Sequence, residues 1–450
     1  MALTLRKHQE EAYNFLMTNQ RLGGLLWHQV GTGKTLTSLV TARTVLGALR
    51  AQGASNPKML VIMPKSASVT WRKECMDNAP DLWQSMVLLP YSRMHEEAQI
   101  LTHQDIRVII CDESHYLKNP ESGRVAMFST MLERISQRNG KFQGGKIIFL
   151  TGTPMLNSAA EFYSTWAVLA APTLLEASQR LLDKRHYMNW EAAFAKNKAV
   201  KFKTRFGEEV GYKADGVQNS DHMTQLLAPI SHIRKAKDCI DLPDMNIIPI
   251  DLGLPDDKLL EDANIEKPEA YMALLERLSR AKAPHMMEWV KEFLESTDQQ
   301  LVMFSMYLEP IYALQAKHPK KVVVITGAET SREREANILA FQGGKVRVIA
   351  MSYAAGAESL NLQNAHIGLH LGYPWTDGKL KQALGRINRS GQKNKTMNYF
   401  MCSGYNDARI LNLVRSKEEA TTEVEMSLQR HEQQNKITLQ TDNESIDDLF

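Results

Sequence analysis

The chain has 450 residues and a net charge of +3, and 43% of its residues are hydrophobic against 23% charged. This balance is typical of globular proteins, and the length predicts two or three domains. The small net charge excludes a strongly basic protein that coats nucleic acid, but it allows a local basic groove. No apolar run reaches the roughly 18 residues of a membrane span, no signal-peptide pattern is found, and the cysteines form no CxxC pair. We therefore expect a soluble protein of a reducing cytoplasm, without a disulfide framework or a zinc site.

The first expected helix spans Leu5 to Leu16, where apolar residues recur at helical spacing. Its Gln9 carries an amide with both a donor and an acceptor, so it can read the edge of an adenine base. The alternative is a solvated glutamine on the helix surface.

A phosphate-binding loop is predicted next, in the segment LLWHQVGTGKT from Leu25 to Thr35. An apolar strand ends in a glycine-rich turn and a helix follows, so backbone N–H groups can cradle phosphate oxygens at the helix N-terminus. The residues expected to bind ATP here are Gly31, Thr32, Gly33, Lys34 and Thr35. Lys34 would reach the β- and γ-phosphates, and Thr35 would hold Mg²⁺. His28 stands where the usual pattern has its first glycine, and an ordinary glycine-rich turn is the alternative.

The strand expected at Met59 to Pro64 leads into a polar, basic loop with Lys65 and Ser66, followed by Trp71. Such a loop at the carboxyl end of a strand suits contact with the phosphates of nucleic acid. A solvated loop without a ligand is the alternative.

The segment RVIICDESH, from Arg107 to His115, delivers Asp112 and Glu113 to the end of an apolar strand. Open α/β sheets bind their ligands at this edge. Asp112 would hold Mg²⁺, Glu113 would orient or deprotonate the attacking water, and His115 would link the nucleotide site to neighbouring motifs. Two acidic residues on the surface are the alternative.

A further strand, Lys146 to Leu150, is followed by the turn TGTP, which places Thr151, Gly152 and Thr153 on the same ligand side. Strands and helices alternate from Leu25 to about Ala170. This alternation predicts a parallel sheet wrapped by helices, which is one RecA-like lobe.

The ordered motifs LRKHQ, GTGKT, MPKSASVTW, DESHYLKN and LTGTP resemble the first lobe of superfamily-two helicases. DESHYLKN followed by LTGTPMLNS is similar to the Swi/Snf-type translocases of double-stranded DNA, and most similar to their compact branch of annealing helicases and fork remodellers. The resemblance implies coupling roles for His115 and for Thr151 to Thr153. It also implies that Lys65, Ser66, Trp71 and Tyr91 contact DNA.

The alternation breaks between residues 171 and 244, which we expect to form a helical, basic connecting region. Lysines and an arginine are interleaved with Phe194, Phe202 and Phe206, and Lys201 and Lys203 are the expected DNA contacts. A solvated helical face with a few core phenylalanines is the alternative. The large insertions of chromatin remodellers are absent from this sequence, so we do not expect action on nucleosomes.

A second parallel-sheet lobe is expected from residue 245 to 405, because strands resume at Leu301, Lys321 and Val346. By the resemblance, the second lobe contacts DNA through Ser305, Gly327, Arg334 and Ser352. The segment SYAAGAESLNL is similar to motif five and implies nucleotide contacts for Gly356 and Glu358, although Ser359 stands where the family usually has glycine.

The segment QALGRINRSGQ places Arg386 and Arg389 three residues apart, on one face of a helix or turn. There they can act as arginine fingers that neutralise charge on the γ-phosphate of a nucleotide held by the other lobe. Gln382 is expected to couple this motif to the rest of the site. A basic surface helix is the alternative.

After this lobe we expect a brace helix over residues 406–433 and an acidic flexible tail over 434–450. Acidic residues with Ile446, Leu449 and Phe450 at the end resemble short motifs that dock on sliding clamps or on single-strand-binding proteins. A disordered tail with an accidental apolar end is the alternative.

Together these features predict an α/β protein with two tandem RecA-like lobes, the first at residues 1–170. By the resemblance it is a monomeric motor that uses ATP and Mg²⁺ to translocate on double-stranded or forked DNA in replication, recombination or repair. A true unwinding helicase on DNA or RNA, and a catalytically silent adaptor that binds DNA and a clamp, are the alternatives. The economy of the chain suggests a bacteriophage or other virus, acting in a bacterial or infected-cell cytoplasm.

Overall fold

The computed structural model describes residues 4–95, 104–138, 142–155, 157–204, 207–254, 268–356, 360–374, 376–404, 407–408, 410–412, 415, 419 and 421–432. Two units are distinguished: residues 1–239 with 417–450, and residues 240–416. Glu358 and the tail residues Ile446, Leu449 and Phe450 lie outside the described residues. The backbone of Lys201 and Lys203 is described, and their side chains are not.

The first unit is built on a six-stranded sheet with the order β3-β2-β4-β5-β1-β8, and all its neighbours pair in parallel. Its strands are β1 (Gly23–His28), β2 (Pro57–Met63), β3 (Met86–Pro90), β4 (Asp105–Asp112), β5 (Lys146–Thr151) and β8 (Ser231–Arg234). The central strands are apolar and buried on both faces, as a parallel sheet between helices requires.

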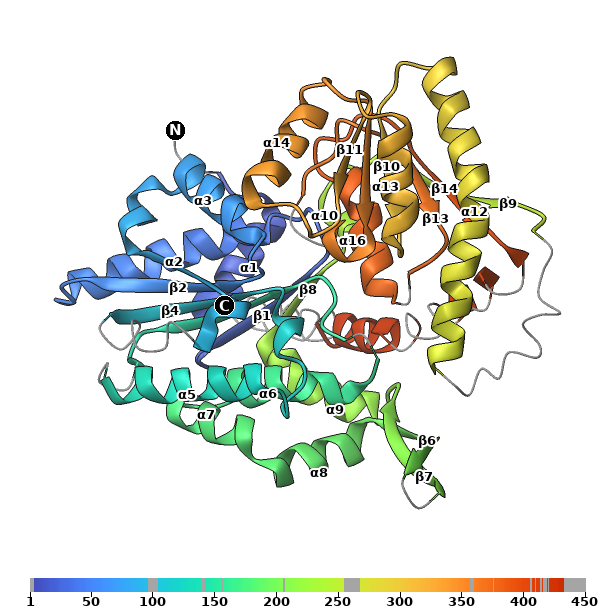
Figure 1. Cartoon of the computed structure of the whole chain (residues 1–450). Helices are drawn as coiled ribbons and strands as arrows, with labels where there is room; N and C mark the ends of the chain where they lie inside the picture. The colour runs from blue at the N-terminus through green and yellow to red at the C-terminus, as the bar shows by residue number, and fades with distance from the viewer. Residues whose placement is uncertain are drawn as a thin grey trace, which may run out of the picture. The chain divides into compact units, whose positions relative to one another are not determined.

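Helices cover both faces of this sheet. One apolar core joins the sheet to α1 (Lys7–Thr18), α2 (Lys34–Ala51) and α3 (Ala67–Asn78). A second core joins its other face to α5 (Gly123–Arg138), α6 (Tyr163–Leu169) and α7 (Leu174–Leu182). Figure 1 shows these two layers of helices on opposite sides of the strands.

Apart from the C-terminal segment, the remaining described residues of the first unit include three further helices, a hairpin and short 3₁₀ turns. The helices are α8 (Lys184–Phe194), α9 (Ser220–Leu227) and α10 (Ala236–Cys239), and the hairpin is β6 (Lys196–Thr204) with β7 (Gly207–Asp215). The 3₁₀ turns are Pro80–Ser85, Tyr91–Arg93, Ser114–Leu117, Ala159–Phe162 and Ala228–Ile230. The hairpin extends away from α8 and α9 as a two-stranded arm (Figure 1).

Residues 171–244 therefore differ from the helical region expected from the sequence. They contain the antiparallel hairpin and also β8, which pairs with β1 and completes the first sheet. The alternating lysines of β6 have the two-residue period of a strand, and only the pairing with β7 distinguishes that pattern from a solvated helix.

The second unit has its own six-stranded parallel sheet, in the order β11-β12-β10-β13-β14-β9. Its strands are β9 (Met245–Asp251), β10 (Leu301–Ser305), β11 (Val322–Ile325), β12 (Val348–Ser352), β13 (Ile367–Leu371) and β14 (Thr396–Cys402). Its helices are α12 (Pro268–Ser296), α13 (Leu308–Lys317), α14 (Ser331–Gln342), α15 (Tyr353–Gly356) and α16 (Asp377–Ile387). Separate apolar clusters fill the two faces of this sheet. The expected α/β fold with two parallel-sheet lobes is confirmed.

The C-terminal segment is helical over residues 421–432, within the residues expected to form a brace helix. Val424 and Leu428 belong to a core of the first unit, and Arg234 donates to Glu432 and to Glu11 of α1. Among the described residues, no helix is long and apolar enough to span a membrane.

Candidate functional site

The loop between β1 and α2 has the backbone that a phosphate-binding turn requires. Gly31 and Gly33 have φ angles of 88° and 81°, in the left-handed region that favours glycine. A Cβ atom at Gly33 would lie 2.3 Å from Gln9 Nε2, so α1 packs directly against this turn. Lys34 begins α2, and its ammonium group donates to the carbonyl oxygen of His28 at 2.7 Å. The cationic side chain is therefore held at the end of β1, beside the turn.

Two buried side chains of α1 fix the shape of this loop. Gln9 accepts the backbone N–H of Arg6 at 2.9 Å through Oε1 and donates to the Gly33 carbonyl at 3.3 Å through Nε2. His8 Nε2 donates to the Thr32 carbonyl at 2.8 Å. His8 is not among the residues predicted from the sequence, although it stands beside Gln9 in the motif LRKHQ. Recognition of adenine by Gln9 stays a prediction.

His28 stands where the usual pattern has glycine, and its side chain packs against the neighbouring strand β8. His28 is 1% exposed, and its Nε2 lies 2.8 Å from Nδ1 of His232 on the neighbouring strand. Burial, followed by the charges of His232 and Lys34, lowers the pKa of His28 well below its usual value. His28 is therefore a neutral structural residue at the base of the loop.

Asp112 ends β4 with both carboxylate oxygens engaged. Oδ2 accepts the indole N–H of Trp71 at 2.8 Å, and Oδ1 accepts the backbone N–H of Glu113 at 3.0 Å. Loss of solvent, followed by the charge of Glu113, raises the pKa of Asp112 to about 6, while Trp71 and Lys34 act in the opposite direction. Strands β1 and β4 both pair in parallel with β5, so the phosphate loop and Asp112 lie at the same edge of the sheet.

The residues at this site fit a magnesium ion. Thr35 lies in the first turn of α2, next to Lys34, and offers a hydroxyl oxygen. Asp112 offers carboxylate oxygens from the facing strand end. Mg²⁺ prefers oxygen ligands and is commonly held by one or two side chains together with substrate phosphates. The donor set predicted from the sequence is therefore chemically suited to Mg²⁺.

A path of side-chain contacts runs from Glu113 to the turn after β5. Glu113 has a φ angle of 50°, a strained conformation for a residue other than glycine, and such strain is concentrated at functional sites. Its Oε2 lies 3.3 Å from His115 Nδ1, which lies 3.3 Å from Thr151 Oγ1. Thr151 Oγ1 in turn accepts the backbone N–H of Thr153 at 3.0 Å. A Cβ atom at Gly152 would lie 3.5 Å from the carbonyl oxygen of His28, the last residue of β1 before the phosphate loop.

In the second unit, α16 and the turn after it position the predicted arginine fingers. Arg386 is 3% exposed and donates through Nε to the Gly356 carbonyl at 2.9 Å. Arg389 donates to the Leu360 carbonyl at 2.9 Å. The two arginines therefore contact Gly356 and Leu360, which are described residues of the segment expected to be motif five. Gln382 is also buried, at 6% exposed, on the same helix.

Two of the predicted DNA contacts, Lys65 and Gly327, are exposed after strand ends, and two others are half-buried. Lys65 is exposed and Ser66 is half-buried directly before α3. In the second unit, Gly327 is exposed with a φ angle of 101°, and Arg334 is half-buried and donates to the Ala355 carbonyl at 3.1 Å.

Four other residues predicted to contact DNA have buried side chains with partners inside their own lobe, and their contact with DNA stays a prediction. Trp71 is 1% exposed and donates to Asp112, and Tyr91 is 5% exposed and stacks on Tyr116 with ring centroids 5.1 Å apart. Ser305 is fully buried and accepts the backbone N–H of Tyr307, whereas Ser352 is 5% exposed and accepts that of Ala355. Sequence spacing located these residues at strand ends, but it could not distinguish an outward side chain from one that braces its own lobe.

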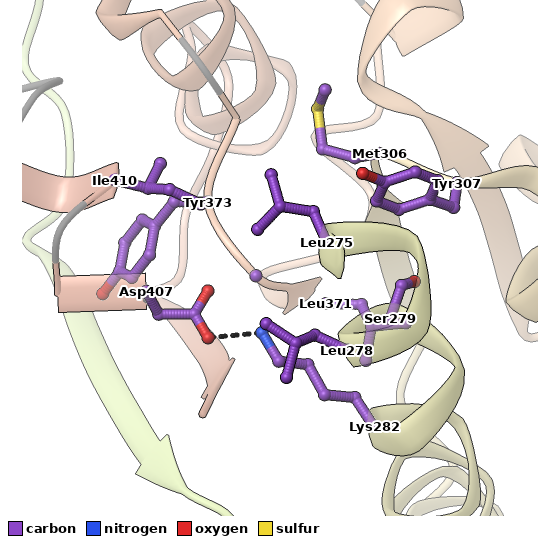
Figure 2. Close-up of a pocket in the computed structure, with 11 residues that line it drawn as sticks. Leu275, Leu278, Ser279, Lys282, Met306, Tyr307, Leu371, Tyr373, Asp407 and Ile410 are labelled. Carbon is purple, nitrogen blue, oxygen red and sulfur yellow. Dashed lines mark hydrogen bonds and ion pairs between the residues drawn. The ribbon is translucent and has the colours of Figure 1, made fainter. Parts of the chain in front are cut away.

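A small cavity of about 30 Å³ lies in the second unit, beside the ends of β10 and β13. Figure 2 shows Lys282 of α12 reaching across its floor to Asp407. The side chains of both residues are 5% exposed, and Asp407 also accepts the backbone N–H of Ser403 at 2.6 Å. A volume of this size accommodates about one water molecule. We interpret this cluster as a buried structural ion pair.

Three family models match consecutive parts of the chain. The model described as "Type III restriction enzyme, res subunit" matches residues 2–70, "SNF2-related domain" matches 81–254, and "Helicase conserved C-terminal domain" matches 285–391. The first two models cover the phosphate loop and the DESH motif, and the third covers α16.

Among similar proteins, human "DNA annealing helicase and endonuclease ZRANB3" is 22% identical over 409 residues, which is 81% of this chain and 36% of that protein. The chain thus spans about a third of the length of this relative. The protein L538 of Acanthamoeba polyphaga mimivirus, whose name includes the words "ATP-dependent RNA helicase", is 23% identical over 411 residues, or 87% of this chain and 85% of that protein. The solved structure "DEAD-box helicase Mss116 bound to ssRNA and UDP-BeF" covers 94% of this chain and 77% of its own, with a TM-score of 0.54 and 12% identity.

Proposed function

The chain belongs to the Swi/Snf-type branch of helicase superfamily two, and from this premise we propose that it is an ATP-driven motor that translocates on double-stranded DNA. The observation that carries the proposal is the contact path from Glu113 through His115 to Thr151. It connects the residue suited to orient water with a turn that passes beside the phosphate loop. Such a path would let hydrolysis at one strand end change the conformation of its neighbour.

In this proposal the phosphate loop binds the triphosphate, and Lys34 neutralises the charge of the β- and γ-phosphates. Thr35 and Asp112 would hold Mg²⁺, which neutralises developing charge on the transferred phosphoryl group. Glu113 would orient the attacking water and accept its proton. For Arg386 and Arg389 we propose the role of arginine fingers, with Gln382, Gly356 and Glu358 supporting them.

The DNA-binding part of the proposal rests on exposed basic and backbone groups. Lys65 and Ser66 in the first unit and Gly327 in the second follow the carboxyl ends of β2 and β11, and Arg334 lies in the first turn of α14. The hairpin of β6 and β7 adds six basic residues against three acidic ones within residues 196–215. Contacts of this kind bind phosphates without reading bases, so binding would be independent of sequence and sensitive to salt.

We propose fork remodelling, branch migration, reannealing or protein displacement as the output, because the name of the relative ZRANB3 includes the words "DNA annealing helicase". The name of L538 favours a second candidate, a motor that acts on RNA. The same relative supports a viral setting, with action in an infected cell. A monomeric state is a further proposal. Docking of the tail on a clamp or a single-strand-binding protein is another, and the acidic and apolar residues of the tail support it.

The test compares ATP hydrolysis without nucleic acid and with duplex DNA, forked DNA, single-stranded DNA or RNA. Duplex or forked DNA should stimulate hydrolysis most strongly. Glu113→Gln should lower turnover by about 10²-fold or more while nucleotide binding persists, since general-base catalysis contributes that much. Glu121→Gln, which changes an exposed carboxylate of the same segment, is the matched control and should remain active. Stimulation by RNA alone would favour the second candidate, a motor that acts on RNA. A rate of hydrolysis in Glu113→Gln equal to that of the wild-type protein would refute the proposed catalytic role of Glu113.

A further inference from the structure

Trp71 makes a contact that core packing alone does not require. It lies in α3, is 1% exposed, and its indole N–H points at Asp112 Oδ2 at 2.8 Å. The other oxygen of Asp112 is held by the backbone N–H of Glu113 at 3.0 Å. Each carboxylate oxygen therefore has one fixed donor, which sets the plane of the group, and each retains acceptor capacity for a further ligand.

We propose that Trp71 is a positioning residue that orients the Asp112 carboxylate for Mg²⁺ and links this site to the Lys65–Ser66 loop. The inference deepens the proposed motor function and rests on it for the identity of the metal and of the loop's ligand. Trp71 itself touches neither nucleotide nor DNA in this role.

The orientation step follows from the geometry of the two donors. A carboxylate at the end of a strand can rotate about its terminal bond, and that torsion has a broad energy minimum. Two donors on different oxygens remove this freedom. Because the residues that hold a metal ligand in place affect metal binding strongly, loss of one such donor typically weakens it 10- to 100-fold.

The link to the loop follows from the order of elements. Strand β2 is hydrogen-bonded to β4, with Ile62 opposite Cys111, and the chain continues from β2 through Lys65 and Ser66 directly into α3. A displacement of α3 caused by phosphate contact at its N-terminus would move the indole relative to Asp112. The loop and the carboxylate are thus connected through one helix turn and one hydrogen bond.

The chain offers a matched control for removal of an indole donor. Trp190 of α8, in the same unit, is 4% exposed and donates through Nε1 to the Ala159 carbonyl at 3.0 Å. Trp71→Phe and Trp190→Phe each replace a buried indole by a smaller apolar ring and each remove one N–H donor. Only the first change affects a residue of the proposed metal site.

The experiment titrates Mg²⁺ against binding of a fluorescent ATP analogue, without DNA, and then measures hydrolysis with and without duplex DNA. Trp71→Phe should raise the Mg²⁺ concentration for half-maximal nucleotide binding about 10-fold or more and should reduce the ratio of DNA-stimulated to basal hydrolysis. Trp190→Phe should leave both quantities at their wild-type values.

If Trp71→Phe fails to fold, site-specific replacement of Trp71 by its benzothiophene analogue removes the N–H while the ring size is kept. An unchanged Mg²⁺ requirement in that protein, or an equal change in Trp190→Phe, would overturn the proposal and leave Trp71 as a core residue. The Mg²⁺ titration needs no DNA. It therefore tests the role of Trp71 even if duplex DNA fails to stimulate the wild-type protein and the motor function is refuted.

Discussion

Gly33→Ala is the most direct perturbation of the phosphate loop. The backbone of Gly33 has a φ angle of 81°, and this left-handed conformation costs a residue with a Cβ about 1–2 kcal/mol. The new methyl group would also lie 2.3 Å from Gln9 Nε2, so the glutamine amide must leave its acceptor on the loop. If the loop relaxes to remove this strain, its ATP-binding conformation becomes less populated by the same free energy.

The expected result is an ATP affinity reduced by about 5- to 30-fold, because each 1.4 kcal/mol corresponds to a factor of ten. Titration with a fluorescent ATP analogue measures it, and urea unfolding reports any loss of stability. The matched control is Gly47→Ala in α2, the helix that follows Gly33, where a Cβ would meet no atom within 4 Å. That change should leave ATP affinity unaltered and increase stability by about 0.5–1 kcal/mol. An affinity of Gly33→Ala within twofold of wild type would refute the strained-loop argument.

Two further predictions concern the second unit. His370 is fully buried, and burial lowers its pKa to about 3, so the unfolded chain but not the folded unit gains a proton as pH falls below about 6.5. Protonation of the unfolded chain at this histidine should lower the free energy of unfolding by about 2 kcal/mol between pH 6.5 and pH 5. Urea unfolding at both pH values should show this loss in the wild-type protein and a smaller loss in His370→Phe. An equal loss in the two proteins would contradict the proposal that buried His370 is the cause. Asp407→Asn leaves the buried ammonium of Lys282 without its carboxylate and should destabilise the unit by about 3–5 kcal/mol in the same assay. Lys282→Met combined with Asp407→Asn should recover much of the loss, and a double variant as unstable as Asp407→Asn would show that the charge is not the cause.

The sequence predicted the parts of the site that are local in the chain. The phosphate loop, Asp112 with Glu113, and the Thr151–Thr153 turn each follow an apolar strand. In a parallel sheet such positions come together at one edge whatever the details of packing. The same rule located the second lobe, since its strands are short apolar runs at the expected spacing.

The directions of side chains and the edge strand β8 could not be predicted from the sequence, because they depend on contacts between distant segments. Trp71 is separated from Asp112 by 41 residues and His28 from His232 by 204, and no local period encodes either pair. A resemblance in motif order assigned Trp71 and Tyr91 to DNA, whereas the packed lobe buries both. The short strand β8 was not predicted because its partner β1 lies about 200 residues earlier in the chain, so no local pattern indicates the pairing.

The phosphate loop also depends on both ends of the described chain. From the N-terminal side, His8 and Gln9 hold the carbonyl groups of the turn. From the other side, Gln29 donates its backbone N–H to the carbonyl of Arg234, whose guanidinium joins Glu11 of α1 to Glu432 of the C-terminal helical segment. Two carboxylates share one partly buried guanidinium, so a shift of either helix would act on Arg234, the residue of β8 whose carbonyl contacts the loop. The C-terminal helical segment is therefore part of the framework that supports the loop between β1 and α2.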